Sequence, residues 1–507
     1  MKNNDDIVLG IDLGTTNSCI AACYSDGQVV VIPSEDGVKT MSSCVFFDDG
    51  VQQVGVRASA KEHPENVIYE MKRLLGRDFE DAEVQVHCRR WPFKVINERD
   101  GMKVAVRQAN VVGKFSPIEI GAIILTELHR RAVAFLKQPI KRTVICVPAN
   151  FSVRQKNATK AAATLAGLEV LATVHEPTAA AVGYNAIDEA VPTGATFMAF
   201  DFGGGTLDVS VVERRADNVF KVLASAGDTS LGGADFDGRL MDHFIEVFRQ
   251  KHQVDLREKD YSIGRAELLE ACEKAKRLLS AEKLTQTKVV VPAIADDIAL
   301  SEVLTRVNFN ELCADLFERI LKPVEKVLEY AGLSRNKMAF VMLIGSSSRM
   351  LKVQELLRTY FGPTVPVKMD HRPDETIAVG AAHYARNIVD GKEPIIDMTS
   401  ATLGIRLKGG IMAPVIPRGT DVPVCRTKRY KTSFAGATAA TISIYQGESE
   451  WVTENQFLAD LKLDDISLTS ESATEIEVVF AYDRFGMLKV TARDPQNNTQ
   501  RELEVHM

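Results

Sequence analysis

Two similar segments, residues 8–16 and 198–206, constrain the fold of this chain more than any other feature of its sequence. Each joins an apolar strand to an aspartate, a glycine-bearing turn and a threonine, so together they form a weak internal repeat. Glycine turns expose backbone N–H groups to a phosphate, and a carboxylate holds magnesium, often through water. Either turn alone is weak evidence, because Asp-x-Gly turns are common between strands. As a facing pair, with Asp12 and Asp201 at matched positions, they predict a clamp for a magnesium-bound nucleoside triphosphate.

The sequence has no Gly-x-x-x-x-Gly-Lys-Ser/Thr phosphate loop, so the paired turns are the only phosphate-binding candidate of this kind. A net charge of -7 favours neither nucleic acid nor an anionic membrane as partner. The N-terminal residues lack the pattern of a signal or transit peptide, and the longest apolar runs are too short to span a membrane. The 8 cysteines show no metal-binding spacing and are expected to be reduced, buried thiols. We therefore expect a cytoplasmic protein.

The 507 residues predict two or three folding units. Apolar strands alternate with amphipathic helices from about residue 7 to 388, whereas short alternating strands follow from about residue 400. Residues 390–397 are polar, contain Gly and Pro and carry a small aliphatic segment, which predicts a linker. The predicted units are thus an α/β domain at 1–389, the linker, and an antiparallel β-sandwich at 398–507.

Two further segments suit the rest of a nucleotide. Gly232 and Gly233 precede an amphipathic helix whose free N–H groups favour an anion or a sugar oxygen, although they also suit a plain helix start. A polar stripe lies on one face of a second helix, and such a stripe is more often simply solvated. Its members are Glu273, Lys276, Arg277 and Ser280.

Several motifs in one order give the chain a specific resemblance to a known family. They are residues 11–18, 72–77, 176–181, 201–208 and 345–349. With them, residues 7 to 507 resemble the seventy-kilodalton heat shock chaperone family. The resemblance implies a duplicated, ribonuclease H-like, actin-like ATPase domain followed by a peptide-binding β-sandwich. It also leads us to expect a chain without the family's helical lid.

The resemblance implies a role for each matching position. Lys72, Glu176, Asp201, Thr206 and Asp208 would be catalytic, with Lys72 stabilising charge on the γ-phosphate. Asp12 and Asp201 would hold Mg²⁺ through water, and K⁺ is a further candidate ion. The positions expected to contact ATP or ADP are Asp12, Gly14, Thr15, Thr16, Asn17, Gly203, Gly204, Gly205, Gly232, Gly233, Glu273, Lys276, Arg277, Ser280, Gly345, Ser346, Ser347, Arg349 and Asp374.

In the sandwich, the resemblance implies an apolar site for an extended peptide. Its expected lining is Ile405, Leu407, Tyr430, Ala440, Ile442 and Ile476, all of which would also suit a sandwich core. Lys408 and Ser433 replace the family's apolar arch over the peptide, which puts client preference in doubt. The linker's aliphatic run shrinks to Ile395 and Ile396, which predicts weaker coupling between the two domains.

Other departures fall in the ATPase half, at His175, Lys156, Ala161, Ala234 and Ser346. The expected function is that of an ATP-hydrolysing chaperone, slow and stimulated by a J-domain protein. Its expected partners are unfolded or nascent polypeptides, a J-domain co-chaperone and a nucleotide exchange factor. The alternative is a non-cycling, ribosome- or complex-associated relative in which ATP is structural. A sugar kinase or an actin-like filament would not need the sandwich.

Overall fold

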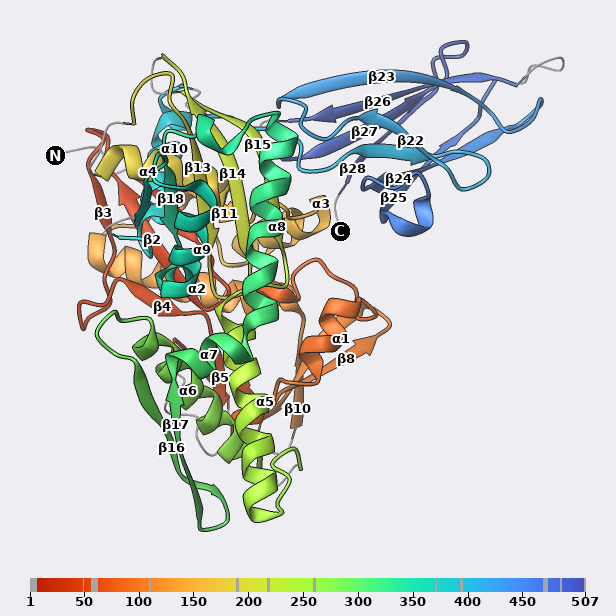
Figure 1. The fold of residues 1–507 in the computed structure, drawn as a ribbon. Helices are drawn as coiled ribbons and strands as arrows, with labels where there is room; N and C mark the ends of the chain where they lie inside the picture. Colours follow the sequence, from red (N-terminus) through yellow and green to blue (C-terminus); the bar gives the residue numbers. More distant parts are fainter. Residues whose placement is uncertain are drawn as a thin grey trace.

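The computed structural model describes residues 7–48, 50–55, 63–108, 111–187, 191–216, 219–258, 261–369, 372–392, 395–467, 473–483 and 486–505. Within these residues a large α/β part is followed by a smaller all-β part, in the order that the sequence predicts (Figure 1). The predicted linker and the segment 483–486 are described only in part. Arg484, Phe485, Glu393 and Pro394 lie outside the described residues, as does the segment 1–6.

The first sheet of the α/β part contains the first of the two repeated turns. Its order is β12 (Glu169–His175), β11 (Arg142–Val147), β1 (Val8–Asp12), β2 (Asn17–Cys23) and β3 (Val29–Val31), with β4 (Thr40–Ser42) paired to β2. Strands β1 and β2 form an antiparallel hairpin, whereas β11 and β12 continue the sheet in parallel. The hairpin therefore ends at the same sheet edge as the carboxyl ends of β11 and β12.

The second sheet repeats this arrangement around the second turn. Its order is β19 (Val367–Met369), β18 (Val341–Ile344), β13 (Thr196–Phe202), β14 (Leu207–Arg214), β15 (Phe220–Asp228) and β20 (Ile395–Ile396). Strands β13 and β14 form the antiparallel hairpin, and β18 and β19 continue in parallel. The shared topology confirms that the repeat in the sequence reflects two related units.

Two helices, α4 (Glu176–Ile187) and α10 (Thr376–Val389), pack between these sheets. A buried apolar cluster draws on both sheets and both helices and joins the two units. The helices cross at very close range, because a Cβ on Gly380 would lie 1.8 Å from the Ala179 carbonyl oxygen. Small residues at this crossing therefore set the distance between the two units.

Other helices cover the outer faces of the sheets. Helices α2 (Pro117–Leu136) and α3 (Val153–Leu165) cover the first sheet, and α8 (Ala314–Ala331) and α9 (Leu351–Phe361) cover the second. Ser116 and Glu119 form a capping box at the start of α2, and Ser152 with Gln155 forms a second box at α3. These caps fix where each helix begins.

Two smaller lobes extend from the two sheets (Figure 1). The first lobe contains β5 (Val45–Asp48), β6 (Val51–Val54), β7 (Val67–Ile68), α1 (Ala82–Cys88), β8 (Lys94–Glu98), β9 (Gly101–Gln108) and β10 (Val111–Phe115). The second contains α5 (Gly233–His252), α6 (Ser262–Leu279), β16 (Gln286–Ala295), β17 (Ile298–Thr305) and α7 (Arg306–Leu312).

The all-β part is a sandwich of two four-stranded sheets, as predicted. One sheet has the order β22 (Met412–Ile416), β21 (Leu403–Arg406), β24 (Ala439–Gln446) and β25 (Gln456–Asp464). The other has the order β23 (Val424–Lys431), β26 (Glu475–Tyr482), β27 (Leu488–Arg493) and β28 (Gln500–Glu504). Alternate residues of these strands fill one apolar core.

The predicted linker is partly a strand of the α/β part. Ile395 and Ile396 form β20, which pairs in parallel with Phe220 and Lys221 at the start of β15. This pairing was not predicted, because a two-residue aliphatic segment has no recognisable strand period. It extends the second sheet by one short edge strand and places the sandwich beside the α/β part.

The sandwich packs directly on α3 and on the second sheet (Figure 1). Val153 of α3 joins the apolar core of the sandwich, and its N–H donates to Gln446 Oε1 at 3.0 Å. On the other side, the Arg418 guanidinium lies 4.1 Å from the ring centre of Tyr330 in α8. The sandwich therefore contacts both units of the α/β part.

Six of the eight cysteines are buried, as predicted, but Cys88 is half-buried and Cys425 is exposed. Cys425 is exposed because it lies on β23, an edge strand of the sandwich. All eight are free thiols. In the part of the chain that the structure describes, no helix is both long and apolar enough to cross a membrane.

Candidate ATP site

The two repeated turns face each other across one cleft. A Cβ on Gly204 would lie 1.9 Å from Thr16 Oγ1, and a Cβ on Gly205 would lie 2.6 Å from Thr15 Oγ1. Only glycine therefore fits at this approach, which leaves backbone N–H groups accessible between the turns. The arrangement matches the cradle that the sequence predicts.

A cavity of about 600 Å³ lies between the turns. Its lining contains Asp12, Gly14, Thr15, Thr16, Asn17, Lys72, Glu176, Asp201, Gly203, Gly204, Thr206, Gly345, Ser346 and Asp374 of the predicted residues. Ser18, Thr40, Pro373 and Ile377 also line it and were not predicted. Most of the predicted phosphate and metal positions thus meet in one place.

The half-buried Asp12 and the buried Glu176 and Asp201 line this cavity, and the buried Asp208 lies next to them. Asp12 ends β1, while Asp201 and Asp208 lie opposite each other on β13 and β14. Burial, and next the charge of Glu176, raise the pKa of Asp12 and of Asp208 to about 7. The same two causes raise the pKa of Asp201 well above its ordinary value. The negative charge of this cluster would therefore favour a bound cation.

Lys72 is the cation that the protein itself places there. It lies in a 3₁₀ turn, Met71–Arg73, and is only 6% exposed. Its ammonium group pairs with Glu176, which is 5% exposed. Burial alone would lower the pKa of Lys72, but Glu176 and Asp12 outweigh it and raise that pKa. Lys72 is thus charged and points at the cavity, a position that its local sequence does not reveal.

Asn150 is a polar neighbour that sequence reasoning missed. Its Nδ2 donates to Asp208 Oδ1 at 3.1 Å and lies where a Cβ on Gly227 would clash. The amide therefore fixes the orientation of the Asp208 carboxylate. No pattern in the surrounding sequence marks this asparagine, because its partner is 58 residues away.

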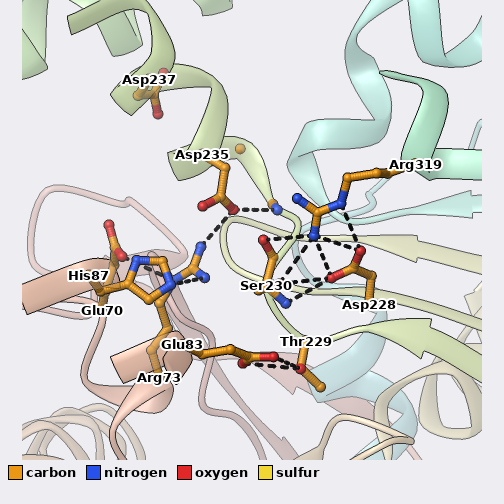
Figure 2. Close-up of polar contacts among 12 residues, drawn as sticks. Glu70, Arg73, Glu83, His87, Asp228, Thr229, Ser230, Asp235, Asp237 and Arg319 are labelled. Atoms are coloured by element: carbon orange, nitrogen blue, oxygen red, sulfur yellow. Dashed lines mark hydrogen bonds and ion pairs between the residues drawn. The ribbon is translucent and has the colours of Figure 1, made fainter. Parts of the chain in front are cut away.

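Arg73, next to Lys72, connects the first lobe to the second (Figure 2). The buried guanidinium lies 3.0 Å from Glu70 Oε2, 2.9 Å from Asp235 Oδ2 and 2.9 Å from His87 Nε2. Burial, and next the charge of Arg73, lower the pKa of His87 to about 3, so this ring is neutral and accepts the hydrogen bond. Sequence reasoning also missed this network.

The network continues to the second turn. Asp235 Oδ2 accepts from the Gly232 N–H at 2.8 Å, and the Gly233 N–H donates to the Gly203 carbonyl at 3.1 Å. Beside it, Arg319 contacts Asp228 at 2.7 Å, and Thr229 donates to Glu83 at 3.2 Å (Figure 2). Contacts across the cleft thus hold the turn of Lys72 against the glycine turn.

Gly345 and Asp374 line the central cavity, whereas the other predicted nucleoside residues lie outside its lining and form a neighbouring group. Lys276 Nζ donates to the Gly233 carbonyl at 2.8 Å and pairs with Asp237 at 2.6 Å. A Cβ on Gly233 would lie 2.5 Å from Ser347 Oγ. Glu273, Arg277 and Ser280 follow the same helix, and Ser280 donates to the Lys276 carbonyl. Arg349 pairs with Asp374 at 3.0 Å across the cleft edge.

The expected peptide residues separate into three groups by burial. Ile405, Ile442 and Ile476 are buried in the sandwich core, and Ala440 and Tyr430 are partly buried against it. Leu407 is exposed. A place in the sandwich core, rather than in a peptide site, therefore accounts for three of the six positions.

Known proteins of similar sequence identify the family of this chain. A model of the Hsp70 protein family matches residues 8–507. The heat shock 70 kDa protein BIP3 of Oryza sativa subsp. japonica is 40% identical over 499 residues, covering 96% of this chain and 73% of that protein. The heat shock cognate 70 kDa protein 3 of Dictyostelium discoideum is 37% identical, covering 96% and 78%. The chain belongs to the Hsp70 family.

Membership of the Hsp70 family supports a chaperone function and an ATPase. The residues that line the cleft also suit Mg²⁺ and ATP. The facing glycine turns leave room for phosphates, and burial together with neighbouring carboxylates raises the pKa values of Asp12 and Asp208. Among the described residues no group of three or more acidic, His or Cys side chains forms a direct metal site. Carboxylate oxygens beside a phosphate cradle are the kind of donors that suit Mg²⁺.

The positions that depart from the usual Hsp70 pattern lie beside the cleft or beside the sandwich. Ser346 lines the cleft cavity, and the Ala234 N–H donates to the Gly204 carbonyl at 2.9 Å. Lys156 Nζ lies 2.9 Å from His175 Nε2 and 3.4 Å from the Tyr482 hydroxyl of the sandwich. Ala161 borders a cavity that Met487 of the sandwich also lines.

Proton release on Mg²⁺ binding is the first expected result. The pKa values of Asp12 and Asp208 are raised to about 7 in the absence of metal. The contribution of these protonated carboxyl groups to the free energy of unfolding is therefore present at low pH and is lost as the pH rises through 7. Mg²⁺ binding should displace these protons, so affinity for Mg²⁺ in the presence of ADP should rise by up to about tenfold per pH unit below pH 7 for each proton.

The measurement is calorimetric titration with Mg²⁺ in two buffers of different ionisation enthalpy, at about pH 6 and about pH 8. Protons should be released at the lower pH and hardly any at the higher. Asp12→Asn should reduce the number released. Equal proton release at both pH values would contradict the raised pKa values.

Proposed function

We propose that this Hsp70 chain is an ATP-hydrolysing chaperone in which hydrolysis in the cleft controls binding of unfolded or nascent polypeptides to the sandwich. The observation that carries the proposal is the buried, charged Lys72, paired with Glu176 and directed into the cavity between the Asp12 and Asp201 turns. A structural nucleotide site would not need a buried ammonium at the phosphates. The proposal therefore favours turnover over static binding.

Each residue then has a part in the reaction. The glycine turns would bind the phosphates by backbone N–H groups, and Lys72 would stabilise charge that develops on the γ-phosphate. Glu176 and Asp208 would orient the attacking water, with Asn150 holding Asp208 in place. Mg²⁺, when bound, neutralises phosphate charge. Lys276, Arg277 and Ser347 would hold the nucleoside beside the cavity.

The partners and the compartment are part of the same proposal. A J-domain co-chaperone would stimulate hydrolysis and an exchange factor would release ADP. The eight free thiols suit a reducing compartment, and we propose the cytoplasm. We place the boundaries of the units at 1–389, 390–397 and 398–507.

The test is single-turnover ATP hydrolysis by the native chain, with and without a J-domain protein. We expect slow basal turnover that the J-domain protein accelerates, together with faster release of a labelled apolar heptapeptide on addition of ATP. ATP binding without any hydrolysis above the buffer rate would instead identify a non-cycling relative. Hydrolysis with unchanged peptide release would contradict the coupling.

A further inference from the structure

Strand β23 carries an unusual concentration of positive charge for a chain with a net charge of -7. Its sequence runs Val-Cys-Arg-Thr-Lys-Arg-Tyr-Lys over residues 424–431, and all four cations are exposed. The strand is an edge of its sheet and lies at the outer margin of the sandwich, away from the ATP cleft (Figure 1). The charge is therefore open to a partner.

The register of β23 places two of these cations in line with the expected peptide site. Tyr430 lies opposite Ile476, Lys428 opposite Val478 and Arg426 opposite Phe480. These residues share one face, so the cations follow Tyr430 at steps of about 7 Å along the open edge. Lys428 reaches across to the second sheet, where its Nζ donates to the Pro414 carbonyl at 2.7 Å.

The second face of β23 has carboxylates nearby, but they are already paired. Arg429 lies 2.9 Å from Glu477 Oε1 and 3.4 Å from Glu475 Oε1, and Arg493 also pairs with Glu477. Lys431 lies opposite Glu475 without an ion pair among the described residues. The two glutamates thus neutralise Arg429 and Arg493 and leave the other cations uncompensated.

Cations also flank Leu407, the exposed residue of the expected peptide site. Arg406 and Lys408 precede and follow it, and both are exposed. Leu407 is 39% exposed, and Phe434, on the loop after β23, is 65% exposed. Apolar contact surface is therefore bordered by positive charge on both β21 and β23. Within the described residues, no carboxylate pairs with Arg406, Lys408, Arg426, Lys428 or Lys431.

Tyr430, on β23 between Arg429 and Lys431, is partly buried against the sandwich core. Its hydroxyl is buried and has no hydrogen-bond partner among the described residues. A buried hydroxyl without a partner is unfavourable, and an extended peptide that offers a carbonyl oxygen beside it would remove that cost. The hydroxyl and the surrounding cations therefore favour the same kind of partner, an extended segment with acceptor groups.

We propose that the sandwich selects extended polypeptide segments whose apolar centre is flanked by aspartate or glutamate. The proposal rests on the polypeptide binding proposed above and names the class of segment that is bound. Each exposed contact between charges contributes little alone, but several act together, and a lysine-flanked segment would meet repulsion at the same positions. An acidic-flanked segment should bind about tenfold more tightly than its neutral counterpart at low salt.

The experiment uses the full chain and fluorescent peptides with one leucine-rich centre, flanked on both sides by two aspartates, two serines or two lysines. Fluorescence anisotropy gives the affinities at about 0.05 M and about 0.3 M salt, which differ in screening. The test variant is Arg426→Glu with Lys428→Glu. The matched control is Arg501→Glu, an exposed cation on β28 at the opposite edge of the same sheet.

We expect the aspartate-flanked peptide to bind most tightly, with an advantage that shrinks at higher salt, reverses in the double variant and persists in the control. Equal affinity for all three peptides would overturn the proposal but leave polypeptide binding intact, and β23 would then only prevent pairing between sheet edges. Failure to bind even the serine-flanked peptide would overturn the proposed polypeptide binding itself. Competition by single-stranded nucleic acid at equal concentration would also overturn acidic-peptide selection.

Discussion

Lys72→Ala should lower the single-turnover rate of ATP hydrolysis by about 100-fold or more, equivalent to about 3 kcal/mol of transition-state stabilisation. The ammonium group is buried, charged and paired with Glu176 beside Asp12, so water cannot replace it. Its charge is needed most when negative charge develops on the transferred phosphoryl group. The loss should therefore fall on the chemical step rather than on ATP binding.

The control for this substitution is Lys288→Ala, which removes an exposed lysine on β16. Its rate should equal that of the native chain. Because Lys72→Ala also leaves Glu176 buried without its partner, the ATP affinity and the thermal midpoint must be measured on the same sample. A folded, ATP-binding Lys72→Ala chain that hydrolyses at the native rate would refute the catalytic part of the proposal.

Asp397→Lys should separate the sandwich from the α/β part. Asp397 Oδ2 lies 2.8 Å from His175 Nδ1, while Lys156 Nζ contacts the other ring nitrogen of His175. Burial acts to raise the pKa of Asp397, but His175 and Lys156 hold it below its ordinary value, so the carboxylate is charged. A lysine there would face Lys156 without compensation. Losing a hydrogen bond to a charged group costs about 1.5–3 kcal/mol, a shift of about tenfold or more in the docking equilibrium.

Hydrogen exchange is the direct measurement of this separation. The amides of Val153 and of β20 should exchange faster in Asp397→Lys, since the first bonds to Gln446 and the second belongs to the β15 edge. The matched control is Asp421→Asn, which removes only an exposed pair with Lys221 at the same interface. Unchanged protection in Asp397→Lys would show that apolar contacts alone hold the sandwich in place.

The sequence predicted the elements that have a regular local pattern. The two hairpins and the change from an α/β part to a β-sandwich were predicted because period and turns are read within a few residues. That the two turns face each other was also predicted, because both repeat the same pattern. The resemblance to one family, rather than the local pattern, pointed to Lys72.

Contacts between distant segments were not predicted. Asn150 with Asp208, Arg73 with Asp235 and His175 with Asp397 each join residues that no local period relates. Burial of Lys72 was hidden for the same reason, since a lysine in a short 3₁₀ turn is usually solvated. Such contacts depend on how whole helices and strands pack, and no local pattern in a single sequence predicts that packing.

The two-residue strand β20 sets how reversible the docked arrangement is. Only Ile395 and Ile396 pair with β15, so the strand can peel away by breaking very few backbone hydrogen bonds, each worth about 1 kcal/mol net. A longer aliphatic strand would make more backbone hydrogen bonds to β15 and would hold the sandwich in place more firmly. The brevity of β20 makes it a release point that a modest input of free energy can open and close, as the proposed coupling between ATP hydrolysis and polypeptide binding would require.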